Sequence, residues 1–157
     1  MELTGNVRKK DRIIEIGAYA LDDSSKILSK FKRLVNNDGK QFTKVVKHLL
    51  ANRATNSLTE NDLANEPKFN IVGKDFIEWI QNHLSHPNDV GILVCHNAAV
   101  DCQFLALELL REKDNLKLPD QLKFVLDTLE LSKKVPPCKR VSGNISSLFI
   151  IVMISNE

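Results

Sequence analysis

The sequence predicts a mixed α/β fold, on the evidence of an early strand hairpin and of two apolar runs that each precede a helix. Strand-like segments cover residues 12–21 and 26–35, and the apolar runs cover residues 91–95 and 124–126. Strands that alternate with helices favour a sheet covered by helices. A length of 157 residues is typical of one domain, so we expect a single core.

The hairpin is expected from the composition of its two arms and of the turn between them. Residues 12–21 (RIIEIGAYAL) have an apolar centre, and residues 26–35 (KILSKFKRLV) alternate apolar and polar side chains in their second half. Residues 22–25 (DDSS) are turn formers. The stretch 36–70 is polar and gives no firm prediction, although apolar residues within 45–50 are spaced as on one face of a short helix.

The rest of the chain alternates between helices and strands. Apolar residues recur at helical spacing over 74–84, which predicts a helix. The run 91–95 (GILVC) is typical of a strand buried on both faces of a parallel sheet. Asn97 is a candidate N-cap of the next helix, expected over residues 98–112. The run 124–126 (FVL) predicts a further strand, and one more helix is expected after it.

The composition is that of a globular protein without a strong charge bias. Hydrophobic residues make up 43% and charged residues 27%, and the formal charge of +2 is the difference between 22 basic and 20 acidic residues. Any nucleic-acid site would therefore have to be local. The three cysteines have no metal-type pairing, and the N-terminus resembles no signal peptide, so we expect an intracellular protein with reduced thiols. The longest apolar run is too short to span a membrane, and no membrane role is expected.

Two carboxylates follow the expected strands of the second half. Asp101 and Asp127 lie where ligands of α/β sheets collect, at the carboxyl ends of strands. Helical counting from Asp101 reaches Phe104, Leu105 and Glu108, so this carboxylate borders the packed face of its helix. Considered alone, both acids are better explained as helix-end residues that complement the dipole or cap the first turn. Only their combination with neighbouring residues favours a catalytic site.

Blocks of residues in chain order resemble the DEDDh exonuclease family, which includes the proofreading subunits of bacterial polymerases and RNase T. The first motif of that family, Asp-x-Glu-x-Thr-Gly followed by a strand, resembles 2–5 (ELTG) and 11–18 (DRIIEIGA). The second motif resembles 96–101 (HNAAVD), with Val100 where the family usually has an aromatic residue. Further similar positions are Thr59, Leu63, Pro67 and Phe69 in the linker, Phe104 and Leu105 after the second motif, and 127–131 (DTLEL).

The resemblance implies an RNase H-like mixed sheet flanked by helices and a metal-dependent 3′-to-5′ exonuclease. It implies two divalent ions, Mg²⁺ or Mn²⁺, which together activate a water and stabilise the leaving oxygen. Glu2 and Asp101 are then the catalytic residues and metal ligands, while the backbone near Leu3 and Thr4 and the side chain of Asn97 lie beside the terminal nucleotide. The implied partners are single-stranded or frayed 3′ ends of DNA or RNA. Oligomers occur among related enzymes, so an oligomer is compatible with the resemblance.

The sequence departs from the family at both ends of the site. The family has an aspartate two residues before the motif glutamate, a position just ahead of Met1. Its third motif is a histidine followed by an aspartate, but no His or Asp occurs after Asp127, and His96 is interpreted as structural. We therefore expect residues 1–148 to be an incomplete exonuclease domain that lacks most of its first strand. Weakened ion binding and impaired activity are expected as well.

The tail 149–157 is expected to be a divergent apolar segment. The run 148–154 (LFIIVMI) is rich in β-branched residues, which favours a strand or an aggregation-prone segment. One hypothesis is that this run packs where the missing first strand belongs. The alternative is an artefactual end of a truncated or misjoined gene.

Three readings of function remain open at this point. The first is a piece of an active exonuclease, and the second is an inactive exonuclease-like module that binds nucleic acid or a protein. The third is an unrelated α/β domain in which all the acids are caps and surface charges. No base-reading motif is visible, so DNA and RNA are equal candidates for the substrate.

Overall fold

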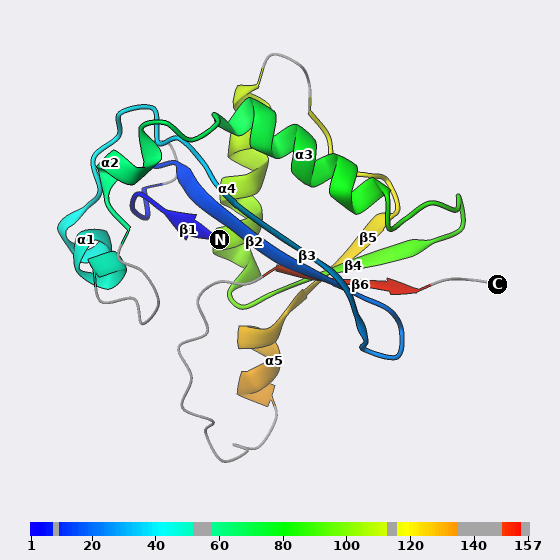
Figure 1. Ribbon diagram of the computed structural model, residues 1–157. Coiled ribbons are helices and arrows are strands. Elements are labelled where there is room, and N and C mark those ends of the chain that lie inside the picture. Colours follow the sequence, from blue (N-terminus) through cyan, green and yellow to red (C-terminus); the bar gives the residue numbers. More distant parts are fainter. Residues whose placement is uncertain (8–9, 52–57, 113–115, 135–148, 155–157) are drawn as a thin grey trace.

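Six strands form one mixed sheet, with helices packed against it (Figure 1). The computed structural model describes residues 1–7, 10–51, 58–112, 116–134 and 149–154. The neighbouring strands follow the order β1-β2-β6-β4-β5, and β3 pairs with the second edge of β2. The predicted α/β class is therefore confirmed, and parallel and antiparallel pairs occur in the same sheet.

The predicted hairpin is the longest feature of the sheet. Strand β2 (Ile13–Leu21) pairs antiparallel with β3 (Ile27–Leu34), from Glu15 opposite Leu34 to Leu21 opposite Ile27. The apolar centre of β2 is buried, whereas most of β3 is exposed. This difference explains why the first arm is nearly all apolar and the second alternates.

Strands β1 and β6 lie end to end on the same edge of β2. Strand β1 (Glu2–Leu3) is antiparallel to β2 and places Glu2 opposite Glu15. Strand β6 (Phe149–Ile154) is parallel to β2 and pairs along Ala18–Leu21. Since β3 covers the other edge over the same residues, both strands must share the remaining edge.

Strand β6 lies in the interior of the sheet, while the hypothesis that it takes the place of the family's first strand stays a prediction. Its other neighbour is β4 (Val90–Cys95), to which it runs antiparallel, so β6 lies between β2 and β4. Its direction is opposite to that of β1, because β6 is parallel to β2 and β1 is antiparallel. The β-branched residues of this run are suited to a strand with neighbours on both edges.

Strand β5 (Leu122–Asp127) forms the edge of the sheet beside β4, to which it runs parallel. Among the described residues, Phe124 and Val125 of this strand are 61% and 57% exposed. The predicted strand is confirmed, and its apolar side chains lie at the surface of the described part.

The described part of the chain contains five helices, which pack around the sheet. Helix α3 (Phe69–Gln81) starts five residues earlier than the predicted helix 74–84 and ends three residues earlier than it. Helix α4 (Ala98–Arg111) matches the predicted 98–112 within one residue. The helix expected after the last strand is α5 (Thr128–Lys134). Two short helices, α1 (Lys44–Ala51) and α2 (Glu60–Leu63), fall in the stretch without a firm prediction. The segment 142–148, which resembles the family's next helix, lies outside the described residues.

The main core lies between the sheet and helices α3 and α4 (Figure 1). Aromatic rings of Phe31, Phe76 and Trp79 gather there, with centroids 5.1 to 6.0 Å apart. A second cluster joins β2 to α1 and α2 through Ile14, Leu50 and Leu63. Both faces of β2 therefore pack against helices, which fixes this strand and the start of β1 beside it.

A buried ion-pair network attaches α4 to the start of β2. The Glu108 side chain is fully buried and accepts hydrogen bonds from Arg12 Nε and Nη2 at 2.7 and 2.8 Å. It also accepts hydrogen bonds from the Ile13 backbone N–H at 3.2 Å and from Arg111 Nη1 at 2.9 Å. A buried charge is tolerated only when it is paired in this way. Because Asp101 is on the same face of α4, the network positions that carboxylate as well.

Substitution Glu108→Ala should destabilise the protein by up to about 3 to 5 kcal/mol, because it removes the buried partner of the half-buried Arg12 and of Arg111. The matched control is Asp38→Asn, which removes a half-exposed partner of Arg12 and should cost less than about 1 kcal/mol. Chemical denaturation measures both values. Equal effects of the two substitutions would contradict the assigned role of Glu108.

Substitution Ile151→Pro should destabilise the sheet by about 3 kcal/mol or more, because proline cannot donate to the ladder of a strand with two neighbours. Ile151 lies opposite Ala20 of β2 and Leu93 of β4. Ile151→Val keeps the backbone N–H and serves as the control. If thermal unfolding shows the proline and valine variants to be equally stable, β6 does not lie in the sheet.

Candidate active site

Two carboxylates from distant parts of the chain approach each other beside β1. Glu2 lies in β1 and is partly exposed, whereas Asp101 lies in the first turn of α4 and is 2% exposed. Their charges interact, since Glu2 contributes to the raised pKa of Asp101. The structure thus brings together the two residues that were expected to be catalytic.

The Asp101 carboxyl group is in an unusual environment for an acid. Its Oδ2 atom is buried and has no hydrogen-bond partner among the described residues. Burial raises the pKa of Asp101 to about 6, the Met1 amino group opposes this shift, and the charges of Glu2 and Asp127 add to it. A buried carboxylate oxygen without a donor is costly. It is also the kind of atom that a cation would satisfy.

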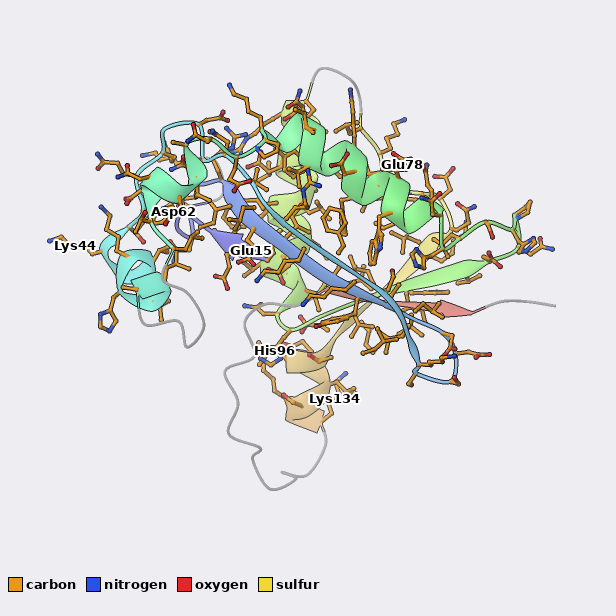
Figure 2. The ribbon with its side chains drawn as sticks, in the orientation of Figure 1. Glu15, Lys44, Asp62, Glu78, His96 and Lys134 are labelled. Carbon is orange, nitrogen blue, oxygen red and sulfur yellow. The ribbon has the colours of Figure 1, made fainter. Side chains whose placement is uncertain are left out.

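Glu15 is a third carboxylate next to this pair, and sequence reasoning did not single it out. It lies opposite Glu2 in the β1–β2 ladder, is buried, and forms an ion pair with Lys32 Nζ at 3.2 Å. Figure 2 shows Glu15 on β2 beside β1. The Met1 amino group interacts with the charges of Glu2, Glu15 and Asp101. The available signal was a lone acid within an otherwise apolar strand.

The Thr4 side chain and backbone are already engaged within the fold. Thr4 Oγ1 donates to Asp11 Oδ1 at 2.9 Å and accepts from the Arg12 N–H at 3.0 Å. Its backbone N–H donates to the Arg12 carbonyl, and its carbonyl accepts from the Thr43 N–H. Leu3 is partly buried and packs against the main core. These two residues are therefore rigidly held beside Glu2.

Gly5 is required by the close approach of Asp11. A Cβ atom on Gly5 would lie 2.5 Å from Asp11 Oδ2, which is shorter than any real contact. The Asp11 carboxylate also accepts a hydrogen bond from the Val7 backbone N–H at 2.7 Å. The Thr-Gly pair of the first motif thus has a structural function in this chain, which is to close the turn between β1 and β2.

Asn97 begins α4, but its side chain does not cap the helix. Its backbone is left-handed, with φ 69° and ψ 55°, and its side chain makes no capping hydrogen bond. The predicted N-cap position of Asn97 is confirmed. The carboxylate that caps the helix belongs to Asp127, at the end of β5, which accepts the N–H groups of Asn97 and Ala98 at 3.0 and 2.9 Å. The Asn97 side chain is exposed at the start of α4, and Asp101 lies in the first turn of the same helix.

Asp127 caps two helices at once. In addition to α4, its Oδ1 atom accepts the Leu129 N–H of α5 at 2.9 Å, as expected for an N-cap. Burial opposes ionisation, but the backbone donors of Leu129, Asn97 and Ala98 outweigh it and lower the pKa of Asp127. The side chain is therefore a charged structural anchor and has little capacity left for a ligand.

His96 lies on the exposed side of the same turn. Its Nδ1 atom is 3.1 Å from Thr128 Oγ1, and that hydroxyl donates to the Cys95 carbonyl at 3.3 Å. Figure 2 shows His96 at the start of α5. Its contact joins the β4–α4 turn to α5.

The carboxylates around Asp101 supply only some of the oxygen ligands that a divalent cation needs. Asp101 offers a buried oxygen without a partner, and Glu2 offers a second carboxylate close by. Within the described ranges, no group of three or more His, Cys, Asp or Glu side chains could hold a metal ion.

None of the described helices has the length and apolar character needed to cross a membrane.

Comparisons with known proteins give a consistent result. Residues 1–141 match the model of the RNase T exonuclease family. The chain is 34% identical to DNA polymerase III subunit epsilon of Treponema pallidum, covering 87% of this chain and 54% of that protein. It is 29% identical to the epsilon subunit of Buchnera aphidicola subsp. Baizongia pistaciae, covering 90% of this chain and 52% of that protein.

A longer relative matches the whole chain. DNA polymerase III PolC-type of Clostridium perfringens is 29% identical over 158 aligned positions, which cover 100% of this chain and 10% of that protein. The chain thus spans about half the length of the two epsilon subunits and a tenth of the PolC-type polymerase.

Asp101→Asn should stabilise the metal-free protein at pH 8 and change it little at pH 4. The folded-state pKa of about 6 lies above the ordinary value of 3.8, so ionisation above pH 6 opposes folding, and protonation at low pH removes that cost. The gain at pH 8 is at most about 3 kcal/mol. Thermal unfolding at both pH values measures it, with the exposed Asp23→Asn as control. A gain of equal size at both pH values would exclude burial of the charge as its cause.

Proposed function

This chain belongs to the RNase T family of DEDDh-type exonucleases, and on that premise we propose that it carries the core of a metal-dependent 3′-to-5′ exonuclease. The reaction is hydrolysis of phosphodiester bonds at the 3′ ends of DNA or RNA. Residues 1–148 form the exonuclease part in this proposal. Family membership excludes the third reading, in which the chain is an unrelated α/β domain.

The observation that carries the proposal is the unpaired Asp101 oxygen beside Glu2. Burial of Asp101 costs stability unless a cation or donor reaches its Oδ2 atom, yet the described fold provides no partner for it. Structural acids in this chain, such as Glu108 and Asp127, have their oxygens occupied by N–H donors. We take this contrast with Glu108 and Asp127 as support for a ligand-binding role of Asp101.

In the proposed site, Glu2 and Asp101 would hold Mg²⁺ or Mn²⁺. Bound there, a divalent ion would supply charge stabilisation for the attacking and leaving oxygens of phosphoryl transfer. In this proposal the exposed Asn97 amide would donate to the terminal nucleotide. Leu3 offers an apolar surface to its base, and Thr4 supports the turn beneath it instead of donating its own hydroxyl.

This chain supplies too few groups for efficient cleavage. Two carboxylates leave most of the six oxygen positions around a magnesium ion to water. A general base contributes about 10²- to 10⁴-fold to such reactions, and the family's histidine has no counterpart after Asp127. We therefore assign weak binding of the two ions expected for the family and impaired activity to these 157 residues.

The second candidate is an inactive exonuclease-like module that binds nucleic acid or a protein partner. The same shortage of ligands favours it, because a fold can be kept for binding after its chemistry is lost. The two candidates differ in whether any slow cleavage depends on Asp101.

A cleavage assay separates them. A single-stranded oligonucleotide labelled at its 5′ end is incubated with the chain and Mn²⁺ or Mg²⁺, and products are resolved by length. We expect cleavage that is at least about 10²-fold slower than that of a related enzyme with the complete motifs, proceeding from the 3′ end. Asp101→Ala should abolish the residual cleavage, and the exposed Asp23→Asn should not change it.

Two outcomes would contradict this assignment. Rapid cleavage that Asp101→Ala abolishes would show that the missing motif residues are not needed. Complete absence of cleavage, with nucleic-acid binding retained, would favour the binding module over the impaired enzyme.

A further inference from the structure

Two adjoining cavities lie at the opposite end of α4 from Asp101. One has a volume of about 410 Å³ and the other about 290 Å³, and they share Arg12, Asp38 and Arg111 in their walls. The first cavity is also lined by the start of α3, and Figure 1 shows that this part of α3 lies beside the end of α4.

The walls of these cavities are rich in cations, although the chain as a whole is nearly neutral. The formal charge of the chain is +2. Five basic residues line the two cavities, against Asp38 and Glu112 as the acidic ones; the basic residues are Lys10, Arg12, Lys40, Lys68 and Arg111. Even when buried Glu108 behind the arginines is counted, positive charge exceeds negative charge. This is the local basic surface that composition alone could not locate.

The arginines are held in fixed orientations. Arg12 uses three N–H groups on Glu108 and Asp38, so two of its five donors remain outside the described hydrogen bonds. Glu108 is fully buried beneath the wall and also holds Arg111 through Nη1. A guanidinium group fixed on one side loses little entropy when it binds an anion on the other.

The lysines contribute charges at the rim. Lys10 and Lys40 are exposed, and no ion pair of either side chain occurs among the described contacts of the chain. Lys68 makes a long ion pair with Asp38, at 3.4 Å. Mobile ammonium groups around fixed guanidinium groups suit phosphates that arrive on a flexible chain.

The cavities and the proposed catalytic site are separated by a distance that one nucleic-acid strand can span. Asp101 and Arg111 are ten positions apart on α4, which corresponds to about 15 Å along the helix axis. A nucleic-acid strand with its 3′ end at Asp101 would need several nucleotides to reach the cavities. The turn between β1 and β2 connects the two places, since it carries Thr4 at one end and Lys10 and Arg12 at the other.

We propose that these two cavities form a phosphate-binding site for the backbone of a nucleic-acid strand, upstream of its 3′ end. The proposal rests on the proposed function only in taking nucleic acid as the phosphate-bearing ligand. Arg12 and Arg111 form the fixed floor of the site, and Lys10 and Lys40 close over the backbone. The site holds the strand through phosphates and reads no base sequence.

Binding of a fluorescent single-stranded DNA of about 12 nucleotides tests the proposal, without metal so that cleavage plays no part. The full chain is compared with Lys10→Gln/Lys40→Gln. We expect the double variant to bind roughly 2- to 30-fold more weakly, as for the loss of two exposed ion pairs. The slope of log affinity against log salt should become shallower by about 1.4, the value for two phosphates on a single strand.

The matched control is Lys26→Gln/Lys123→Gln, which removes the same charge from exposed positions outside the cavities. Unchanged affinity and slope in this control, with both reduced in the first variant, support the site. An equal loss in both variants would assign the effect to overall charge and overturn the proposal. No binding of the DNA by the unmodified chain at low salt would also overturn it. None of these outcomes depends on whether the chain cleaves.

Discussion

The ion pair between Glu108 and Arg12 is the contact on which the arrangement of this chain depends. It joins α4 to the first residues of β2, 96 positions earlier in the sequence. Because β1 pairs with the same part of β2, fixing α4 there also fixes Asp101 relative to Glu2. Two parallel hydrogen bonds from Arg12 and one from the Ile13 N–H fix the orientation of the Glu108 carboxylate. The ion pair therefore sets the orientation of α4 relative to β2 as well as the distance between them. The same carboxylate holds Arg12 and Arg111 in the wall of the basic cavities, and thus supports both proposed sites from one buried position.

Backbone pairing sets the second constraint. One edge of β2 is occupied by β3, and the other is divided between β1 and β6. Strand β6 uses this edge of β2 from Ala18 to Leu21. The centre of this sheet is therefore completed by a strand of opposite direction to β1, which satisfies hydrogen bonds but places no further acid beside Glu2.

Local patterns predicted the hairpin, the strand after α3 and the packed face of α4, since Phe104, Leu105 and Glu108 are all buried with Asp101. Local patterns were insufficient where contacts between residues distant in the sequence determine the structure. The apolar spacing within 45–50 indicated helix α1, but α2 is fixed by the apolar contact of Leu63 with the cluster around Ile14 of β2, which no local period reveals. Asn97 occupies the N-cap position of α4 as predicted, but the capping carboxylate belongs to Asp127, thirty positions later. The resemblance identified Glu2 and Asp101, whereas the buried Glu15 opposite Glu2 required the strand register.

We propose that Asp101, buried with an unsatisfied oxygen and interacting with the charge of Glu2, forms a weak cation site in this exonuclease fold. Paramagnetic broadening of the backbone amide signals by Mn²⁺ tests this site most directly, because it reports the position of the ion without requiring cleavage. We expect the signals near Glu2 and Asp101 to broaden first, and we expect Asp101→Asn to remove this selectivity. Broadening that begins elsewhere and is unaffected by the substitution would contradict it.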